Sequence, residues 1–105
     1  MTYGFVQVVP APIEVYDALH AEIVRRKDPT SCGLLVHVGR PMPEGFQVIE
    51  VWESKGQQER FNAEVVEPAM TQLSGGEPPS TGPAREAFEP RGLIVRGARV
   101  GSDGV

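Results

Sequence analysis

A histidine and a glutamate stand inside two runs that otherwise have the composition of β-strands. His37 lies within residues 34–38 and Glu50 within residues 46–52, and both runs are rich in aliphatic and aromatic side chains. An imidazole and a carboxylate in apolar surroundings form a general acid/base pair that can take a proton from an acidic substrate. We therefore predict His37 and Glu50 as catalytic residues.

Whether these two side chains meet depends on the register of the strands. If His37 pairs with Val48, then Leu35 and Glu50 lie on the same face as His37, because alternate residues of a strand share a side. A slip of one residue moves His37 to the face of Gln47. The alternatives are a histidine with a structural role and a glutamate that pairs across a subunit interface.

Five further residues are predicted to line a substrate site. Trp52 is the only tryptophan, and it suits either a pocket wall for an aromatic ligand or a core or interface position. Gln7 is polar in a strand-like run and can donate to a bound carbonyl, and Tyr16 offers a hydroxyl group. The full predicted set is Phe5, Gln7, Tyr16, Leu35 and Trp52.

The remaining reactive side chains favour structural roles. His20 sits on the apolar stripe of a predicted helix and is more typical of packing than of ligand binding. Cys32 is the single cysteine, so no intrachain disulfide forms, and no neighbouring residue activates its thiol. Two separated histidines and one cysteine make no zinc set. No glycine-rich phosphate cradle leads from a strand into a helix, so we expect no bound cofactor and no metal.

Size and charge narrow the class of protein. A chain of 105 residues is one domain, and its net charge of −4 gives no electrostatic footprint for nucleic acid. No apolar run reaches the length of a membrane span, and the N-terminus lacks a signal-like basic and apolar pattern. We expect a soluble, cytoplasmic protein that binds neither nucleic acid nor membrane.

The chain divides into six predicted elements. Pattern and breakers indicate a strand, a helix ended by Asp28-Pro29, a hairpin with a long loop at residues 40–45, a second helix that Pro68 kinks or divides, and a final strand. Ser54 and Gln57 form a capping box at the start of the second helix. The predicted ranges are 3–9, 13–27, 34–38, 46–52, 54–73 and 93–95, followed by a frayed tail, and the domain is residues 1–96 with a flexible tail at 97–105.

This order is the ferredoxin-like pattern, an α+β fold with a four-stranded antiparallel sheet and two helices on one face. The helix-free face is also apolar, because it carries either Phe46, Val48 and Trp52 or Ile49 and Val51. Large apolar faces are seldom left in water. We therefore expect a second copy of the chain to cover it in a homodimer.

The segment from Gly45 to Ser54, GFQVIEVWES, passes into a helix that carries Glu59-Arg60-Phe61 and later Glu67-Pro68-Ala69. This pattern resembles the antibiotic biosynthesis monooxygenase-like branch of the dimeric α+β barrel superfamily. The resemblance implies a homodimer whose two sheets enclose a barrel. The superfamily includes cofactor-independent monooxygenases, heme-degrading oxygenases, isomerases and peroxidases, so the resemblance specifies the fold more closely than the reaction.

The heme-degrading members pair a tryptophan on the third strand with a histidine on the following helix and an asparagine on the first strand. Trp52 matches that tryptophan, but residues 55–73 contain no histidine, Asn62 cannot replace an axial imidazole, and the first strand offers Gln7. The resemblance therefore does not extend to the heme ligands.

The leading hypothesis is a small-molecule-binding dimer, acting as a cofactor-independent monooxygenase or isomerase on a hydrophobic, aromatic or polyketide-like substrate. The alternatives are a non-catalytic ligand-binding or regulatory dimer and a heme-binding relative.

Overall fold

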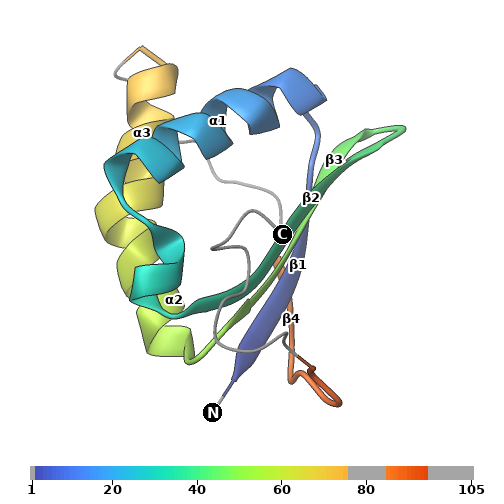
Figure 1. The fold of residues 1–105 in the computed structure, drawn as a ribbon. Helices are drawn as coiled ribbons and strands as arrows, with labels where there is room; N and C mark the ends of the chain where they lie inside the picture. Colours follow the sequence, from blue (N-terminus) through green and yellow to red (C-terminus); the bar gives the residue numbers. More distant parts are fainter. Residues whose placement is uncertain (1, 76–84, 95–105) are drawn as a thin grey trace.

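The computed structural model describes residues 2–75 and 85–94, and these form two layers. One layer is an antiparallel sheet with the strand order β2-β3-β1-β4. The helices lie together on one side of that sheet (Figure 1). This order confirms the predicted ferredoxin-like fold. The elements are β1 (Tyr3–Val9), α1 (Ile13–Arg26), β2 (Leu34–Met42), β3 (Gly45–Trp52), α2 (Lys55–Phe61), α3 (Glu67–Leu73) and β4 (Arg85–Phe88), with a short 3-10 turn at Pro29–Cys32.

The β2–β3 hairpin is tighter than its prolines suggested. Met42 pairs directly with Gly45, so only two residues form the turn and the predicted long loop is wrong. His37 consequently pairs with Glu50 rather than with Val48. The register differs from the predicted one by two residues. Because side chains alternate, a shift of two keeps every residue on its predicted face.

A β-bulge interrupts this pairing near the start of β2. Leu34 pairs with Trp52 and Val36 with Val51, which leaves Leu35 as the extra residue between them. Leu34 packs against the core cluster. Leu34 therefore holds the place opposite Trp52, and the assignment of Leu35 to the face of His37 stays a prediction.

The core lies between the sheet and the helix that follows β3. Phe5 and Trp52 from the sheet meet Phe61 and Val65 from the helix, and both sheet residues are 2% exposed. Ala69 farther along is fully buried. Removing aromatic surface of this size from water is the main stabilising contribution that a small domain has available. By contrast, no residue of α1 is fully buried.

The helix after β3 begins as the sequence predicts and is divided just before Pro68. The Ser54 hydroxyl accepts the backbone N–H of Gln57 at 3.2 Å and donates to the Gln57 side-chain oxygen at 2.8 Å. The helix is then interrupted by a π-helical turn, Asn62–Val66, directly before α3. Pro68 lacks an N–H and its ring crowds the preceding turn, and a wider turn relieves that clash.

The fourth strand is not where the apolar pattern predicted it. It spans Arg85–Phe88 and pairs with β1, whereas Leu93 and Ile94 lie outside any strand and Val95 falls outside the described residues. Phe88 pairs with Gly4, and a Cβ at Gly4 would lie 2.6 Å from the Phe88 ring. An edge strand made of exposed residues has no apolar run to reveal it. The predicted tail at 97–105 also lies outside the described residues.

The helix-free face of the sheet is apolar, as predicted, and carries Ile49 and Val51. Opposite partners in the ladder place Val6 and Val38 beside Ile49 on this face. Val38 is 45% exposed and Phe88, on the same face, is 38% exposed. Among the helices of the described residues, none has the length and apolar content needed to cross a membrane.

Candidate active site

His37 and Glu50 form a hydrogen-bonded pair on the helix-facing side of the sheet. They are directly opposed on β2 and β3, and His37 Nδ1 lies 2.7 Å from Glu50 Oε2. Their side chains are 22% and 16% exposed, so water reaches them only in part. A carboxylate only accepts, so Nδ1 carries the proton of this bond. Glu50 thereby orients the imidazole.

Trp52 holds the other oxygen of the same carboxylate. Its indole Nε1–H donates to Glu50 Oε1 at 2.8 Å, two residues along β3. The indole packs against the Phe61 ring with 5.3 Å between centroids, within the buried core. Because this donor is fixed by packing, Glu50 is held from both sides. The only tryptophan therefore connects the core with the His37–Glu50 pair.

Tyr16 reaches the pair from α1. Its hydroxyl lies 2.7 Å from His37 Nε2, and the two rings stack at 5.8 Å with an interplanar angle of 10°. The ring also meets the buried Phe46 ring edge-on at 5.5 Å. With Nδ1 protonated towards Glu50, a neutral His37 accepts the Tyr16 O–H at Nε2. The result is one continuous chain from Trp52 through Glu50 and His37 to Tyr16.

His20 stands one helical turn beyond Tyr16. Its Nδ1 is 3.5 Å from the Tyr16 hydroxyl, and its ring stacks on the Tyr16 and His37 rings at 5.5 and 5.4 Å. Partial burial of the ring against these neighbours lowers the pKa of His20, and the charge of His37 lowers it further, while Asp17 acts in the opposite direction. Sequence reasoning assigned His20 to packing; its spacing of four residues from Tyr16 is the signal that connects it to this site.

Ionisation of Tyr16 is disfavoured in this position. Burial raises the pKa of the Tyr16 phenol, and the negative charges of Glu50 and Asp17 raise it further. An anion at Tyr16 would be repelled by the nearby carboxylates of Glu50 and Asp17. Tyr16 is therefore a neutral hydroxyl group at ordinary pH.

A second polar group lies on the β1–β4 side of the same face. The Arg85 guanidinium sits 4.3 Å above the Phe5 ring and donates to Gln7 Oε1 at 3.4 Å and to Asn62 Oδ1 at 3.2 Å. Asn62 begins the π-helical turn and donates to Glu67 at 2.9 Å. Arg85 was not predicted as a site residue, because the edge strand that presents it was placed elsewhere, and Asn62 was considered only as a heme ligand and rejected.

The sheet thus brings most of the predicted residues to one face. Phe5 and Gln7 on β1 share that face with Glu50 and Trp52 on β3, and His37 joins them from β2. Tyr16 covers His37 from α1. Leu35, at the bulge, has no pairing partner that assigns it to a face.

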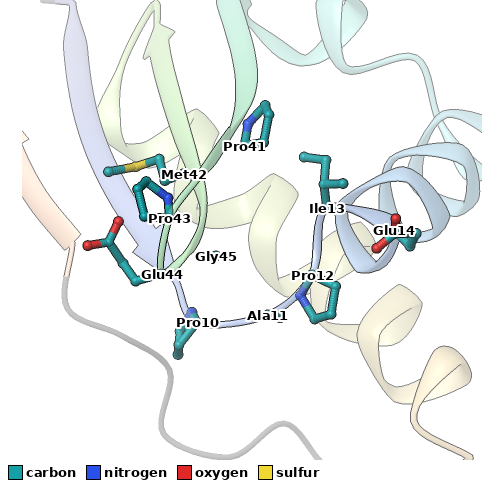
Figure 2. Close-up of a pocket in the computed structure, with 10 residues that line it drawn as sticks. All are labelled: Pro10, Ala11, Pro12, Ile13, Glu14, Pro41, Met42, Pro43, Glu44 and Gly45. Atoms are coloured by element: carbon teal, nitrogen blue, oxygen red, sulfur yellow. The ribbon is translucent and has the colours of Figure 1, made fainter.

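An open pocket of about 460 Å³ lies apart from these residues, at the tip of the hairpin (Figure 2). It is formed by the turn between β1 and α1, residues 10–14, and by the end of the hairpin, residues 41–45. Figure 2 shows Glu44 on the hairpin side and Glu14 on the helix side. Among residues 2–75 and 85–94, the side chains that usually bind metals form no group of three that could hold an ion.

The strand order and the helices on a single face define an α+β protein of the ferredoxin-like type, and its hydrogen-bonded chain from Trp52 to Tyr16 lies between the two layers. No family model and no curated protein sequence matches this chain. Solved structures do match it, over almost its whole length.

A provisionally named antibiotic biosynthesis monooxygenase from Chloroflexus aurantiacus is similar over 90% of this chain and 97% of its own, with 22% identity and a TM-score of 0.61. A conserved protein from Methanosarcina mazei Go1 matches over 87% and 94%, with 11% identity and a TM-score of 0.62. SnoaB, a cofactor-independent oxygenase from Streptomyces nogalater, matches over 89% and 94%, with 15% identity and a TM-score of 0.53. The chain therefore has the fold of the antibiotic biosynthesis monooxygenase-type proteins.

Proposed function

We propose that this protein is a small-molecule-binding enzyme that acts, without a bound cofactor, as a monooxygenase or isomerase on an aromatic or polyketide-like substrate. The observation that carries the proposal is the His37–Glu50 pair at 2.7 Å, on the helix-facing side of the sheet. The fold shared with SnoaB, which its name describes as a cofactor-independent oxygenase, supports the same reading.

The first step is removal of a proton from an acidic position of the substrate. His37 accepts the proton, and Glu50 stabilises the resulting imidazolium. The substrate anion then has two outcomes. Return of the proton to a different carbon gives an isomer. Reaction with O₂ at a methylene carbon gives a carbonyl group and one water, and the four electrons that O₂ needs come from the substrate itself.

The five predicted substrate residues divide by exposure. Tyr16 and Gln7 are partly exposed and serve as ligand contacts in this proposal. Phe5 and Trp52 are 2% exposed, so they support the site from below, and Trp52 acts through Glu50. Leu35 has the weakest claim, because of its place in the bulge.

A homodimer is part of the proposal. The helix-free face carries exposed apolar residues, including Val38 and Phe88, and such a face is seldom left in water. The same face of a second copy of the chain is equally apolar and can cover it. In such a dimer the acid/base chain remains inside each subunit, between sheet and helices.

Anthrone, a tricyclic aromatic ketone with an acidic methylene group, is a suitable probe. Deuterium exchange at that methylene, followed by mass spectrometry, reports proton removal, and an oxygen electrode reports oxygenation. Glu50→Gln and His37→Gln should each slow exchange about 100-fold or more. The control is Glu59→Gln, whose carboxylate is exposed on α2 and should leave the rate unchanged.

Unchanged exchange in both site variants would remove the enzymatic assignment. Saturable binding of anthrone without exchange or oxygen uptake would instead favour a non-catalytic ligand-binding or regulatory dimer. A hemin titration that shifts the Soret band would favour a heme-binding relative.

A further inference from the structure

Neither nitrogen of His37 faces an open position. Nδ1 is bonded to Glu50 Oε2 at 2.7 Å, and Nε2 is bonded to the Tyr16 hydroxyl at the same distance. A base must be within hydrogen-bond reach of the proton that it removes. A ligand that reaches His37 in this arrangement has to displace Tyr16 or act through it.

The Tyr16 hydroxyl has capacity for one more strong hydrogen bond. A phenol offers one proton and two acceptor positions, and the proton is given to His37. The remaining contact, to His20 Nδ1 at 3.5 Å, is long for a hydrogen bond. A ligand hydroxyl at an ordinary distance would replace this contact. His20 is exposed, so the approach to this side of the Tyr16 oxygen begins at the surface.

The Tyr16 ring is fixed in place by its neighbours. It lies directly against Gly39 of β2, where any Cβ would overlap the ring, and its edge meets the buried Phe46. Gly39 pairs with Val48, two residues along the ladder from the His37–Glu50 pair. Contact with Gly39 and Phe46 keeps the Tyr16 hydroxyl hydrogen-bonded to His37 Nε2.

We propose that Tyr16 is the group that meets the substrate, and that it relays the proton of a phenol or enol ligand to His37. The ligand O–H donates to the Tyr16 oxygen while the Tyr16 O–H proton moves to His37 Nε2. One O–H bond breaks in the ligand and one re-forms on Tyr16, so Tyr16 stays neutral. The products are a ligand oxyanion and an imidazolium held by Glu50. This inference rests on the proposed function and adds its ligand class.

The electrostatics of Tyr16 agree with a relay. Burial and Glu50 raise the pKa of Tyr16, which opposes storing a phenolate there but does not oppose simultaneous gain and loss of a proton. A direct phenolate base would need the opposite shift.

The test uses 4-nitrophenol as the probe, at a pH where the free phenol is mostly protonated. Its visible phenolate band reports the ligand proton, and ¹⁵N NMR of the two histidines reports where that proton goes. With the wild-type protein, binding should produce the phenolate band and a charged His37. Tyr16→Phe should reduce the phenolate fraction at least tenfold. Tyr3→Phe is the matched control, because Tyr3 packs against the core, and it should leave the band unchanged.

Gly39→Ala is a second variant that keeps the hydroxyl but displaces the ring, and it should also lose the band. Circular dichroism establishes that each variant is folded. If His37→Gln keeps the band, the proposed function fails, and this inference fails with it. If His37→Gln loses the band while both Tyr16→Phe and Gly39→Ala keep it, His37 acts directly and only the relay is overturned. Failure of the wild-type protein to bind 4-nitrophenol, or binding without the band, would overturn the ligand class.

Discussion

The phenol ring of Tyr16 lies on the backbone of Gly39, in space that any other residue at that position would fill with its Cβ. Gly39 is paired within β2, and its conformation does not require a glycine; the close approach of the ring does. This contact fixes where the Tyr16 hydroxyl lies, and hence whether His37 Nε2 has its partner.

Gly39→Ala should therefore weaken the protein. Crowding of the ring should lower the free energy of unfolding by about 1–3 kcal/mol, measured by urea titration followed with the fluorescence of Trp52. The His37 ring signals in NMR should shift as the Tyr16 bond is lost. The control is Gly56→Ala on α2, where a Cβ meets no atom within 4 Å. That substitution should stabilise the protein by up to about 1 kcal/mol. Equal effects of the two variants would contradict the close contact.

Tyr16 should make stability fall in alkaline solution. Burial, Glu50 and Asp17 raise the pKa of Tyr16, so the folded state holds this proton more tightly than the unfolded chain does. The stabilisation is present below the unfolded value of about 10 and is lost as the pH rises through the folded value. Tyr16→Phe should remove this part of the alkaline decline in urea titrations, whereas Tyr3→Phe should not. A decline that is identical in wild type and Tyr16→Phe would contradict the assignment.

His20 should make the stability of the protein fall in acid solution. Burial against Tyr16 and His37, together with the charge of His37, lowers the pKa of His20. Its stabilisation is present above the unfolded value of about 6.5 and is lost as the pH falls through the folded value. With only two histidines in the chain, NMR titration resolves each ring, and His20→Gln assigns the signals. Protonation of His20 at or above the unfolded value would contradict the stacked arrangement.

Val38 tests the proposed dimer. Aspartate at this position would bring like charges together where two helix-free faces meet, and desolvating them is costly. Sedimentation velocity should show a dimer for the wild-type protein and a monomer for Val38→Asp. Val24→Asp on α1 is the matched control, since Val24 is 50% exposed on the other layer, and it should remain dimeric. A wild-type protein that sediments as a monomer at working concentration would remove the dimer.

The fold was predictable from local patterns because its first five elements carry strong signals. Ser54 caps its helix as its spacing with Gln57 indicates. The hairpin length was not predictable, since two prolines within four residues of a glycine fit both a long loop and a tight turn. The predicted face of His37 survived that error, because the shift was an even number of residues.

The edge strand β4 and the bulge at Leu35 depend on long-range contacts. The Phe88 ring lies over Gly4, and no residue near Phe88 in the sequence indicates that contact. The candidate residues on the other strands were identified from the alternation of side chains along each strand. The contact of Tyr16 with His37 spans two layers, 21 residues apart. Sequence patterns placed Tyr16 on the apolar face of a helix and identified its hydroxyl as a possible ligand contact, but they did not indicate that the hydroxyl bonds to His37.

The π-helical turn at Asn62–Val66 has a bearing on how this helix tolerates insertions and deletions. Phe61, Val65 and Ala69 are all buried and are spaced four apart. In a regular α-helix each such step overshoots a full circle by about 40°, so the third residue would rotate well off the interior side. The wider turn absorbs that overshoot. Removing a single residue there would leave Phe61 and Ala69 seven positions apart, about 20° short of two full turns of a regular α-helix, so Ala69 would stay on the buried side and the far end of the helix would remain in phase with the core.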